Sequence, residues 1–120
     1  MAAGAFHRSV GASADVTGAE RLWSAEVEML PGAVSKPHHH SDCETSIYII
    51  QGSARFYAGD SLEQLLDAGP GDFVWVPSNE VNVEQNTSAD QSLHMIVTRS
   101  PNDVTVEVAA PAGWRTPTSG

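Results

Sequence analysis

The sequence lacks the features that stabilise small secreted proteins or anchor a chain in a membrane. Its 120 residues include one cysteine, Cys43, and a single thiol cannot form an internal disulfide. No run approaches the ~20 apolar residues that span a bilayer, and Met1 to Val10 has no apolar core like that of a signal peptide. Helical patterns are also scarce, since Ser61 to Leu66 is too short for a stable helix. These absences predict a cytoplasmic protein that folds without disulfides.

Positive charge is scarce as well. Six Lys and Arg residues stand against 15 Asp and Glu, which gives a formal net charge of −9. Such a chain repels phosphate backbones and anionic lipid surfaces, so neither nucleic acid nor a membrane is an expected partner. The length suits one hydrophobic core. We therefore predict a single domain over 1–120, with an N-terminal arm at 1–20 and a loose tail at 111–120.

What the chain does contain is a series of short strand patterns between turn residues. From Arg21 to Leu30, polar and apolar residues alternate, as in a strand with one buried face. Ser46 to Gln51 is β-branched and aromatic, which favours a buried strand. Gly11 to Gly18 is predicted to be a loop. Further strands are predicted at 53–57, 62–66, 73–76, 81–84, 92–98 and 104–108. This spacing is typical of an all-β sandwich or small barrel.

Three consecutive histidines follow the first turn. Residues i and i+2 of a strand share a face, so His38 and His40 can direct two imidazoles to one point while His39 points away. Neutral imidazole is a good ligand for Zn, Fe, Mn or Ni. Glu44 can supply a third, anionic ligand and leave open metal positions for catalysis. The alternative is a solvated polar loop with three surface histidines.

This segment resembles the first motif of the cupin superfamily. The matching positions are Gly32, His38, His40, Glu44 and Gly52. Seven residues separate Glu44 from Gly52, where the family has six, and the family's glutamate position can fall on Thr45, which is no substitute for a carboxylate. We expect a β-bulge near Glu44 that turns its side chain back toward the histidines.

A second stretch is similar to the second cupin motif. Gly71, Pro77 and Asn86 stand at the family spacing. Asn79 replaces a glycine, which is tolerable because Asn also accepts the left-handed conformation. Asn82 replaces the histidine that is a metal ligand in the family. The resemblance implies an antiparallel cupin β-barrel (a double-stranded β-helix, or jelly roll) that binds a divalent transition metal. It also implies a homodimer formed by exchange of terminal strands.

The Asn82 substitution leaves three possibilities for the site. In the first, His38, His40 and Glu44 hold the metal, and Asn82 or water completes its shell. In the second, another side chain takes the place of the missing histidine. In the third, the site has lost its metal and binds a ligand by hydrogen bonds.

Three residues could take the place of the missing histidine. Glu84 shares a strand face with Asn82, His94 lies on a later strand, and a shift of register could bring in His39. His94 has a simpler interpretation as a core histidine whose ring is satisfied by a backbone group. Cys43 is either a soft ligand or a buried small residue.

The function that these features predict is a small metal-dependent cupin enzyme acting on an oxygen-rich or aromatic metabolite. Its chemistry would be that of an isomerase, lyase, cyclase or dioxygenase, with Glu84 as the candidate general base. The alternative is a non-catalytic or metal-free cupin that binds a small molecule, which the Asn82 substitution suggests.

Overall fold

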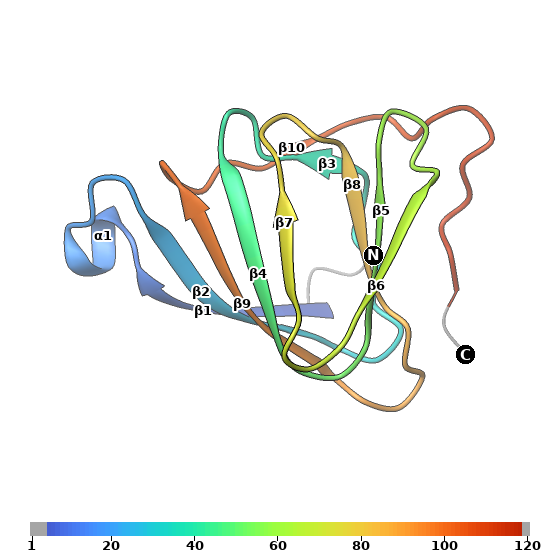
Figure 1. Cartoon of the computed structure of the whole chain (residues 1–120), viewed down its shortest axis with the longest axis horizontal. Coiled ribbons are helices and arrows are strands. Elements are labelled where there is room, and N and C mark those ends of the chain that lie inside the picture. The colour runs from blue at the N-terminus through green and yellow to red at the C-terminus, as the bar shows by residue number, and fades with distance from the viewer. Residues whose placement is uncertain (1–4, 119–120) are drawn as a thin grey trace.

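The computed structural model describes residues 5–118. In it, ten strands form two facing antiparallel sheets, and one short helix lies outside them (Figure 1). The first sheet holds, in spatial order, β1 (Phe6–Ala12), β2 (Trp23–Met29), β9 (Leu93–Ser100), β4 (Glu44–Gln51) and β7 (Phe73–Val76). The second holds β10 (Val106–Glu107), β3 (His38–His39), β8 (Asn82–Asn86), β5 (Ala54–Ala58) and β6 (Gln64–Ala68). The all-β prediction is confirmed.

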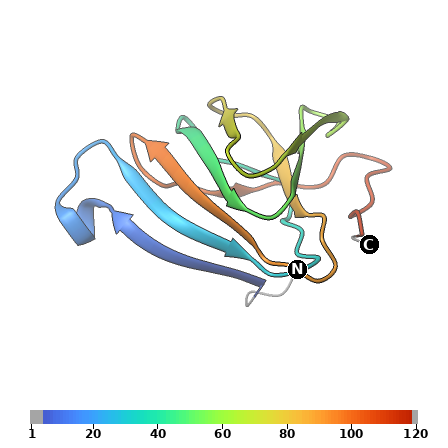
Figure 2. The same ribbon diagram turned by 60° about the horizontal axis from the view of Figure 1, so that its bottom comes forward.

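The core lies between the two sheets because alternate residues of each strand face inward. In β2, Trp23, Ala25, Val27 and Met29 are buried and the residues between them are more exposed, as the alternating pattern predicts. Figure 2 shows the four strands β1, β2, β9 and β4 side by side as one layer. No helix in the described part of the chain is long and apolar enough to cross a membrane.

Two turns require the left-handed backbone conformation. Asn79, at the position where the motif has glycine, has φ 62°, so the expectation that asparagine adopts this conformation is confirmed. Gly52 has φ 98°, and a Cβ built there would lie 2.8 Å from the carbonyl oxygen of Ser92. A larger residue at position 52 would therefore be both strained and in contact with the start of β9.

The N-terminal region departs from the sequence-based prediction. Residues 6–12 form strand β1, paired with β2, and a four-residue helix α1 (Ala14–Thr17) follows where a loop was expected. The side chain of Ser13 caps this helix by accepting from the Val16 amide. β1 is an edge strand whose side chains are mostly exposed, so the sequence carries no hydrophobic alternation there to reveal it.

One residue of the predicted C-terminal tail, Trp114, contacts the second sheet. Trp114 packs against Tyr57, with ring centroids 5.2 Å apart, over a cluster that includes Val34, Leu62 and Val83. The tail therefore covers the outer face of the second sheet. Leu62 lies in a turn with φ 55° rather than in a strand, so β6 begins two residues later than the pattern predicts.

Candidate functional site

A cavity of about 240 Å³ lies between the sheets at the side where β1 and β10 form the free edges. Its walls combine two histidines, three cationic side chains and two carboxylates with apolar and hydroxyl groups. The lining residues are Phe6, Arg8, Val27, Ser35, Lys36, His38, His40, Glu84, Val97, Arg99, Thr105 and Glu107. Both histidines that were expected to converge thus reach the same cavity.

The two imidazoles are close and fixed by the backbone. The ring centroids of His38 and His40 lie 4.9 Å apart in an edge-to-face arrangement, and both residues are buried. Nδ1 of His38 lies 2.7 Å from the carbonyl oxygen of Lys36, and Nδ1 of His40 lies 2.8 Å from that of Val104. Because a carbonyl oxygen only accepts, each Nδ1 carries a proton, and in a neutral ring Nε2 then has the lone pair.

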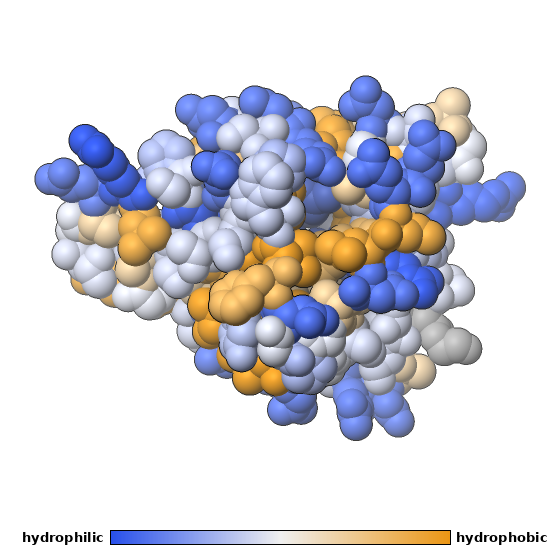
Figure 3. Space-filling model, in the orientation of Figure 1, coloured by the Kyte–Doolittle hydropathy of each residue, from blue (hydrophilic) through white to orange (hydrophobic). Residues whose placement is uncertain are grey.

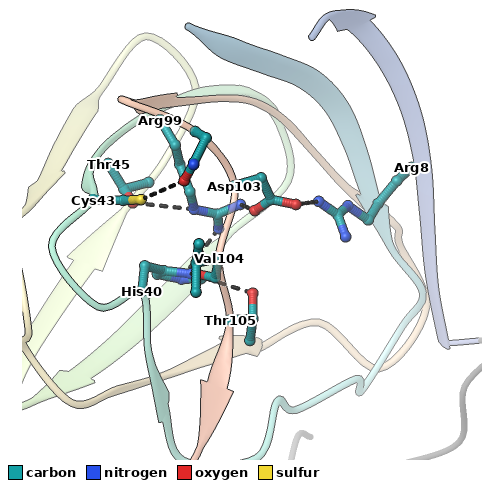
Figure 4. Close-up of polar contacts among 9 residues, drawn as sticks. Arg8, His40, Cys43, Thr45, Arg99, Asp103, Val104 and Thr105 are labelled. Atoms are coloured by element: carbon teal, nitrogen blue, oxygen red, sulfur yellow. Dashed lines mark hydrogen bonds and ion pairs between the residues drawn. The ribbon is translucent and has the colours of Figure 1, made fainter. Parts of the chain in front are cut away.

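A buried arginine occupies the base of this cavity. Arg99, at the end of β9, donates from Nη2 to Nε2 of His40 at 3.2 Å, from Nη1 to Asp103 at 2.7 Å and from Nε to Thr45 at 3.2 Å. Asp103 also accepts from Arg8 at 2.7 Å, so one carboxylate joins two guanidinium groups. Figure 4 shows this chain of contacts from Arg8 through Asp103 and Arg99 to His40.

Burial and the neighbouring guanidinium make His40 a neutral group. Desolvation lowers the pKa of His40 from 6.5 to about 4, and the positive charge of Arg99 acts in the same direction. Burial also lowers the pKa of Arg99, but arginine starts so high that it keeps its proton at neutral pH. The site therefore presents a permanent cation beside an uncharged imidazole whose Nε2 accepts a hydrogen bond.

The sequence-based prediction did not identify Arg99 and its partners as site residues. The signal was available in the alternation of β9, where Leu93, Met95 and Val97 face the core. Arg99 occupies the next inward position of that series. A buried arginine is costly unless acceptors or a counter-charge pair with it, so its position in the series marks it as a candidate site residue. No local pattern marks Asp103 or Arg8, which the fold brings together across 95 residues.

The placement expected for Glu44 is wrong. Its register with β9 runs regularly from the Glu44–Ser100 pair to the Ile49–Met95 pair, so the expected bulge near Glu44 is absent. Glu44 lies on the outer face, exposed, and its Oε1 accepts from Nε1 of Trp75 at 2.8 Å. Thr45 takes the inward position instead and is 2% exposed.

The two residues of β8 that were predicted for the site lie in different surroundings. Glu84 lines the cavity with His38 and His40, as a general base would have to. Asn82, the cross-strand partner of His38, is 2% exposed and donates from Nδ2 to the carbonyl oxygen of Glu80 at 3.2 Å. Its Oδ1 has no hydrogen-bond partner among the described residues.

Asn82 lines a second hollow rather than the histidine cavity. This second hollow has a volume of about 220 Å³ and lies between β6 and β7, the other two free edges of the sheets. Its remaining walls are mostly apolar. They are Phe56, Ala58, Gln64, Leu65, Leu66, Val74, Trp75, Val76 and Glu80.

The other proposed ligands lie outside the cavity. His39 accepts at Nδ1 from the Ser41 amide and is not among the lining residues. His94 lies on the outer face of the first sheet, 3.9 Å from carboxylate oxygens of Glu26 and Glu28, so it is not the core histidine that the pattern favoured. Cys43 is buried, and its thiol donates to Asn102 at 3.2 Å.

These donors do not form a metal site in the arrangement observed. Nε2 of His40 already accepts from Arg99, and a guanidinium at the ligating nitrogen opposes a cation there. Glu44 lies on the opposite face of its sheet. Within residues 5–118, no group of three or more His, Cys, Asp or Glu side chains is close enough to hold a metal ion.

Comparison with known proteins agrees with this architecture. The Cupin domain family matches residues 25–98. KdgF from Halomonas sp. is 20% identical, with a TM-score of 0.69 over 85% of this chain and 84% of that protein. A Klebsiella pneumoniae protein described as having a double-stranded β-helix domain is 16% identical, with a TM-score of 0.73 over 91% of this chain and 89% of that one.

An oxalate decarboxylase from Lactobacillus farciminis is 20% identical to this chain. The two superpose with a TM-score of 0.75, and the superposition covers 90% of this chain but 32% of that enzyme. No curated protein matches the sequence. The chain belongs to the cupin family, because the family match covers more than half of it and the solved structures share its fold. The resemblance expected from the two sequence motifs is thereby confirmed.

Proposed function

We propose that this cupin binds a small organic acid in the cavity between its sheets, without a resident metal. The observation that carries the proposal is the buried guanidinium of Arg99 at the base of the cavity, where its side chain is 8% exposed. A guanidinium has five N–H donors, and the three contacts to Thr45, Asp103 and His40 leave others available. Its planar fork matches a carboxylate better than any other side chain does.

The groups around Arg99 favour an acid that also carries hydroxyl groups. Nε2 of His38 keeps a lone pair, and the carboxylate of Glu84 lines the same cavity. Both accept hydrogen bonds from a ligand hydroxyl, while Lys36 adds a second cation to the wall. A space of about 240 Å³ is about eight times the ~30 Å³ that a water molecule occupies in the liquid. We therefore propose a hydroxy acid of around ten non-hydrogen atoms, for which the predicted cytoplasmic location is suitable.

Calorimetric titration of metal-free protein tests this function. The probes are lactate, malate, tartrate and oxalate. Oxalate is included because one of the structurally similar proteins is an oxalate decarboxylase. At least one probe should bind, and Arg99→Gln should weaken it by about 10- to 100-fold because a charge-assisted hydrogen bond is lost. Arg99→Lys should retain part of the affinity, and its folding can be checked by circular dichroism.

Arg55→Gln is the matched control, because Arg55 pairs with Asp67 on the exterior and lies outside the cavity. It should leave the affinity unchanged. If none of the four probes binds the metal-free protein, or if Arg99→Gln binds as tightly as the wild type, the proposal is wrong.

A metal-dependent enzyme acting on an oxygen-rich or aromatic metabolite is the second candidate. One observation favours it. Asn82 is buried opposite His38 on the neighbouring strand, and its Oδ1 has no partner among the described residues, so this oxygen could bind a metal ion. His38 and His40 would be the nitrogen ligands of that metal ion, held by their Nδ1 contacts to the backbone. This function requires Arg99 to leave Nε2 of His40 and the amide of Asn82 to turn from the second hollow toward the histidines. Glu84 would remain the candidate general base.

Elemental analysis of untagged protein purified without chelator distinguishes the two functions. About one Zn, Fe, Mn or Ni per chain that is lost in His40→Ala would favour the metal-dependent enzyme. Less than a tenth of an equivalent, even after incubation with each metal, would eliminate it.

A further inference from the structure

The histidine cavity carries charges of opposite sign on its two facing walls. The first sheet contributes the cations Arg8 of β1 and Arg99 of β9. The second sheet contributes the carboxylates Glu84 of β8 and Glu107 of β10. A ligand that spans the cavity from one sheet to the other therefore meets a guanidinium at one end and a carboxylate at the other.

The charges around this cavity balance. The two arginines and Lys36 supply three positive charges. Glu84 and Glu107 line the same cavity, and Asp103 accepts hydrogen bonds from both arginines, so the carboxylates also number three. An acid that brings one more negative charge meets no excess of cations here, whereas an acid that also carries an ammonium group matches both walls and adds no net charge.

Glu84 faces Arg99 across the cavity without touching it. Glu84 is half-buried, and its carboxylate has no hydrogen bond or ion pair with another residue of the described chain. Burial lowers the pKa of Arg99, and the negative charge of Glu84 is the strongest influence that opposes this shift. The two charges therefore interact over a gap. A partly desolvated carboxylate is costly unless a cation pairs with it, so a cationic group of a ligand would be stabilised in this gap.

The surroundings of Glu84 consist of acceptors that suit a group with several donors. His38 lies on β3, between β8 and β10. Glu107 is its direct cross-strand partner, so their side chains share a face. In its neutral form the ring of His38 has a lone pair at Nε2, because Nδ1 donates to the backbone. An ammonium has three N–H donors and no acceptor, whereas a hydroxyl has one donor. This wall therefore suits an ammonium better than a hydroxyl.

We infer that the acid bound in this cavity is an amino acid, with its carboxylate on Arg99 and its ammonium on Glu84. The inference rests on the proposed function, because it needs Arg99 to receive a carboxylate. It changes the group that faces the second sheet from a hydroxyl to an ammonium. Glu84 is then the residue that selects an amino acid over the hydroxy acid of the same shape.

The second hollow offers no comparable site. Figure 3 shows an apolar band across the centre of the side on which β6 and β7 lie. Among the described residues that line the second hollow, Glu80 is the one charged side chain. No cation stands there to receive the carboxylate of an amino acid, so the inference applies to the histidine cavity alone.

Calorimetric titration of the full chain, free of metal, with matched pairs of acids tests the inference. The pairs are alanine with lactate, serine with glycerate, and aspartate with malate, whose members differ only in an ammonium or a hydroxyl at the same carbon. In at least one pair the amino acid should bind tenfold or more tightly than its hydroxy counterpart, because a charge-assisted hydrogen bond is about twice as strong as a neutral one.

Three variants assign this preference to particular side chains. Glu84→Gln keeps the size of the side chain and should reduce the preference to less than about threefold by weakening the amino acid alone. Arg99→Gln should weaken both members of the pair by the same factor, because both carry the carboxylate. Glu26→Gln is the matched control, since it removes the same charge from an exposed side chain outside the cavity, and it should leave the preference unchanged. Circular dichroism checks that each variant folds.

The possible failures separate the inference from the proposed function. If the hydroxy acids bind as tightly as the amino acids, the inference is wrong and the proposed function stands. A preference that persists in Glu84→Gln, or that Glu26→Gln removes as well, would show that Glu84 does not receive the ammonium. If no acid of either kind binds, both the proposed function and the inference are wrong.

Discussion

Two hollows of nearly equal volume, about 240 and 220 Å³, lie at opposite free edges of the two sheets. The first is lined by His38, His40 and Arg99 and includes three cationic side chains. The second is lined mainly by aliphatic and aromatic residues, with the amide of Asn82 at its wall. The two hollows differ in the chemistry of their walls and not in size. The first offers charged and polar contacts, and the second offers mainly apolar ones.

The difference arises from the connecting segments at the two edges. At the first edge, the segment after β9 returns across the cavity and brings Asp103 to Arg8 and Arg99 and the carbonyl oxygen of Val104 to His40. This satisfies the buried polar groups. At the second edge, β6 and β7 are joined by a tight turn in which Asp72 accepts from the Gly69 amide. No segment of the described chain is left to cover Trp75 and Leu66, which stay exposed.

The largest expected effect comes from removing the cation of the first hollow. Arg99→Met should lower the free energy of unfolding by about 3 kcal/mol, because Thr45 and His40 lose their buried donor and Asp103 keeps one of its two partners. Urea unfolding measures this. Arg8→Met, at a more exposed side chain, should cost less than about 1 kcal/mol. Equal losses in the two variants would show that burial does not distinguish them.

Acidification should act through the same hollow. The folded-state pKa of His40, about 4, lies below its ordinary 6.5, so between these values the unfolded chain binds more protons than the folded one. The contribution of His40 to stability should therefore be constant above pH 6.5 and fall by about 2 kcal/mol as the pH drops to 4, a figure that allows for solvent screening. Urea midpoints across this range measure the slope. His40→Gln should flatten it, and an unchanged slope in that variant would assign it to other groups.

A smaller effect, of opposite sign, is expected at the second hollow. Asn82→Leu removes an amide oxygen that is buried without a partner among the described residues and should raise the free energy of unfolding by about 1 kcal/mol, with the lost Nδ2 contact already subtracted. Thermal unfolding of metal-free protein measures it. A clear destabilisation, or loss of a bound metal in this variant, would instead give Asn82 the ligand role of the second candidate function.

The smallest effect is expected at Glu44. Glu44→Gln should change neither ligand affinity nor metal content and should shift stability by less than about 0.5 kcal/mol, because the exposed side chain loses little at the surface. The same titrations and elemental analysis apply. A loss of metal or ligand binding tenfold or greater would require Glu44 to reach the cavity, contrary to the observed register.

The sequence by itself determined most of the strands and the histidine pair, although not the edge strand β1. The alternation of β2 and the spacing of His38 and His40 follow from the two-residue period of a strand, which is a local property of the chain. The left-handed turn at Asn79 is local in the same sense. The cupin motifs therefore led to the right fold, and three of the predicted site residues, His38, His40 and Glu84, line the cavity together.

Only the tertiary structure decided what surrounds those histidines. Whether Glu44 or Thr45 faces inward depends on the register of β4 against β9, and a shift of one residue exchanges the two faces of a strand. The contacts of Arg99 with His40 and Asp103 join segments that no local pattern relates. Trp75 and Leu66 likewise stay exposed because β6 and β7 are the final strands of their sheets, so no further strand covers the hollow between them.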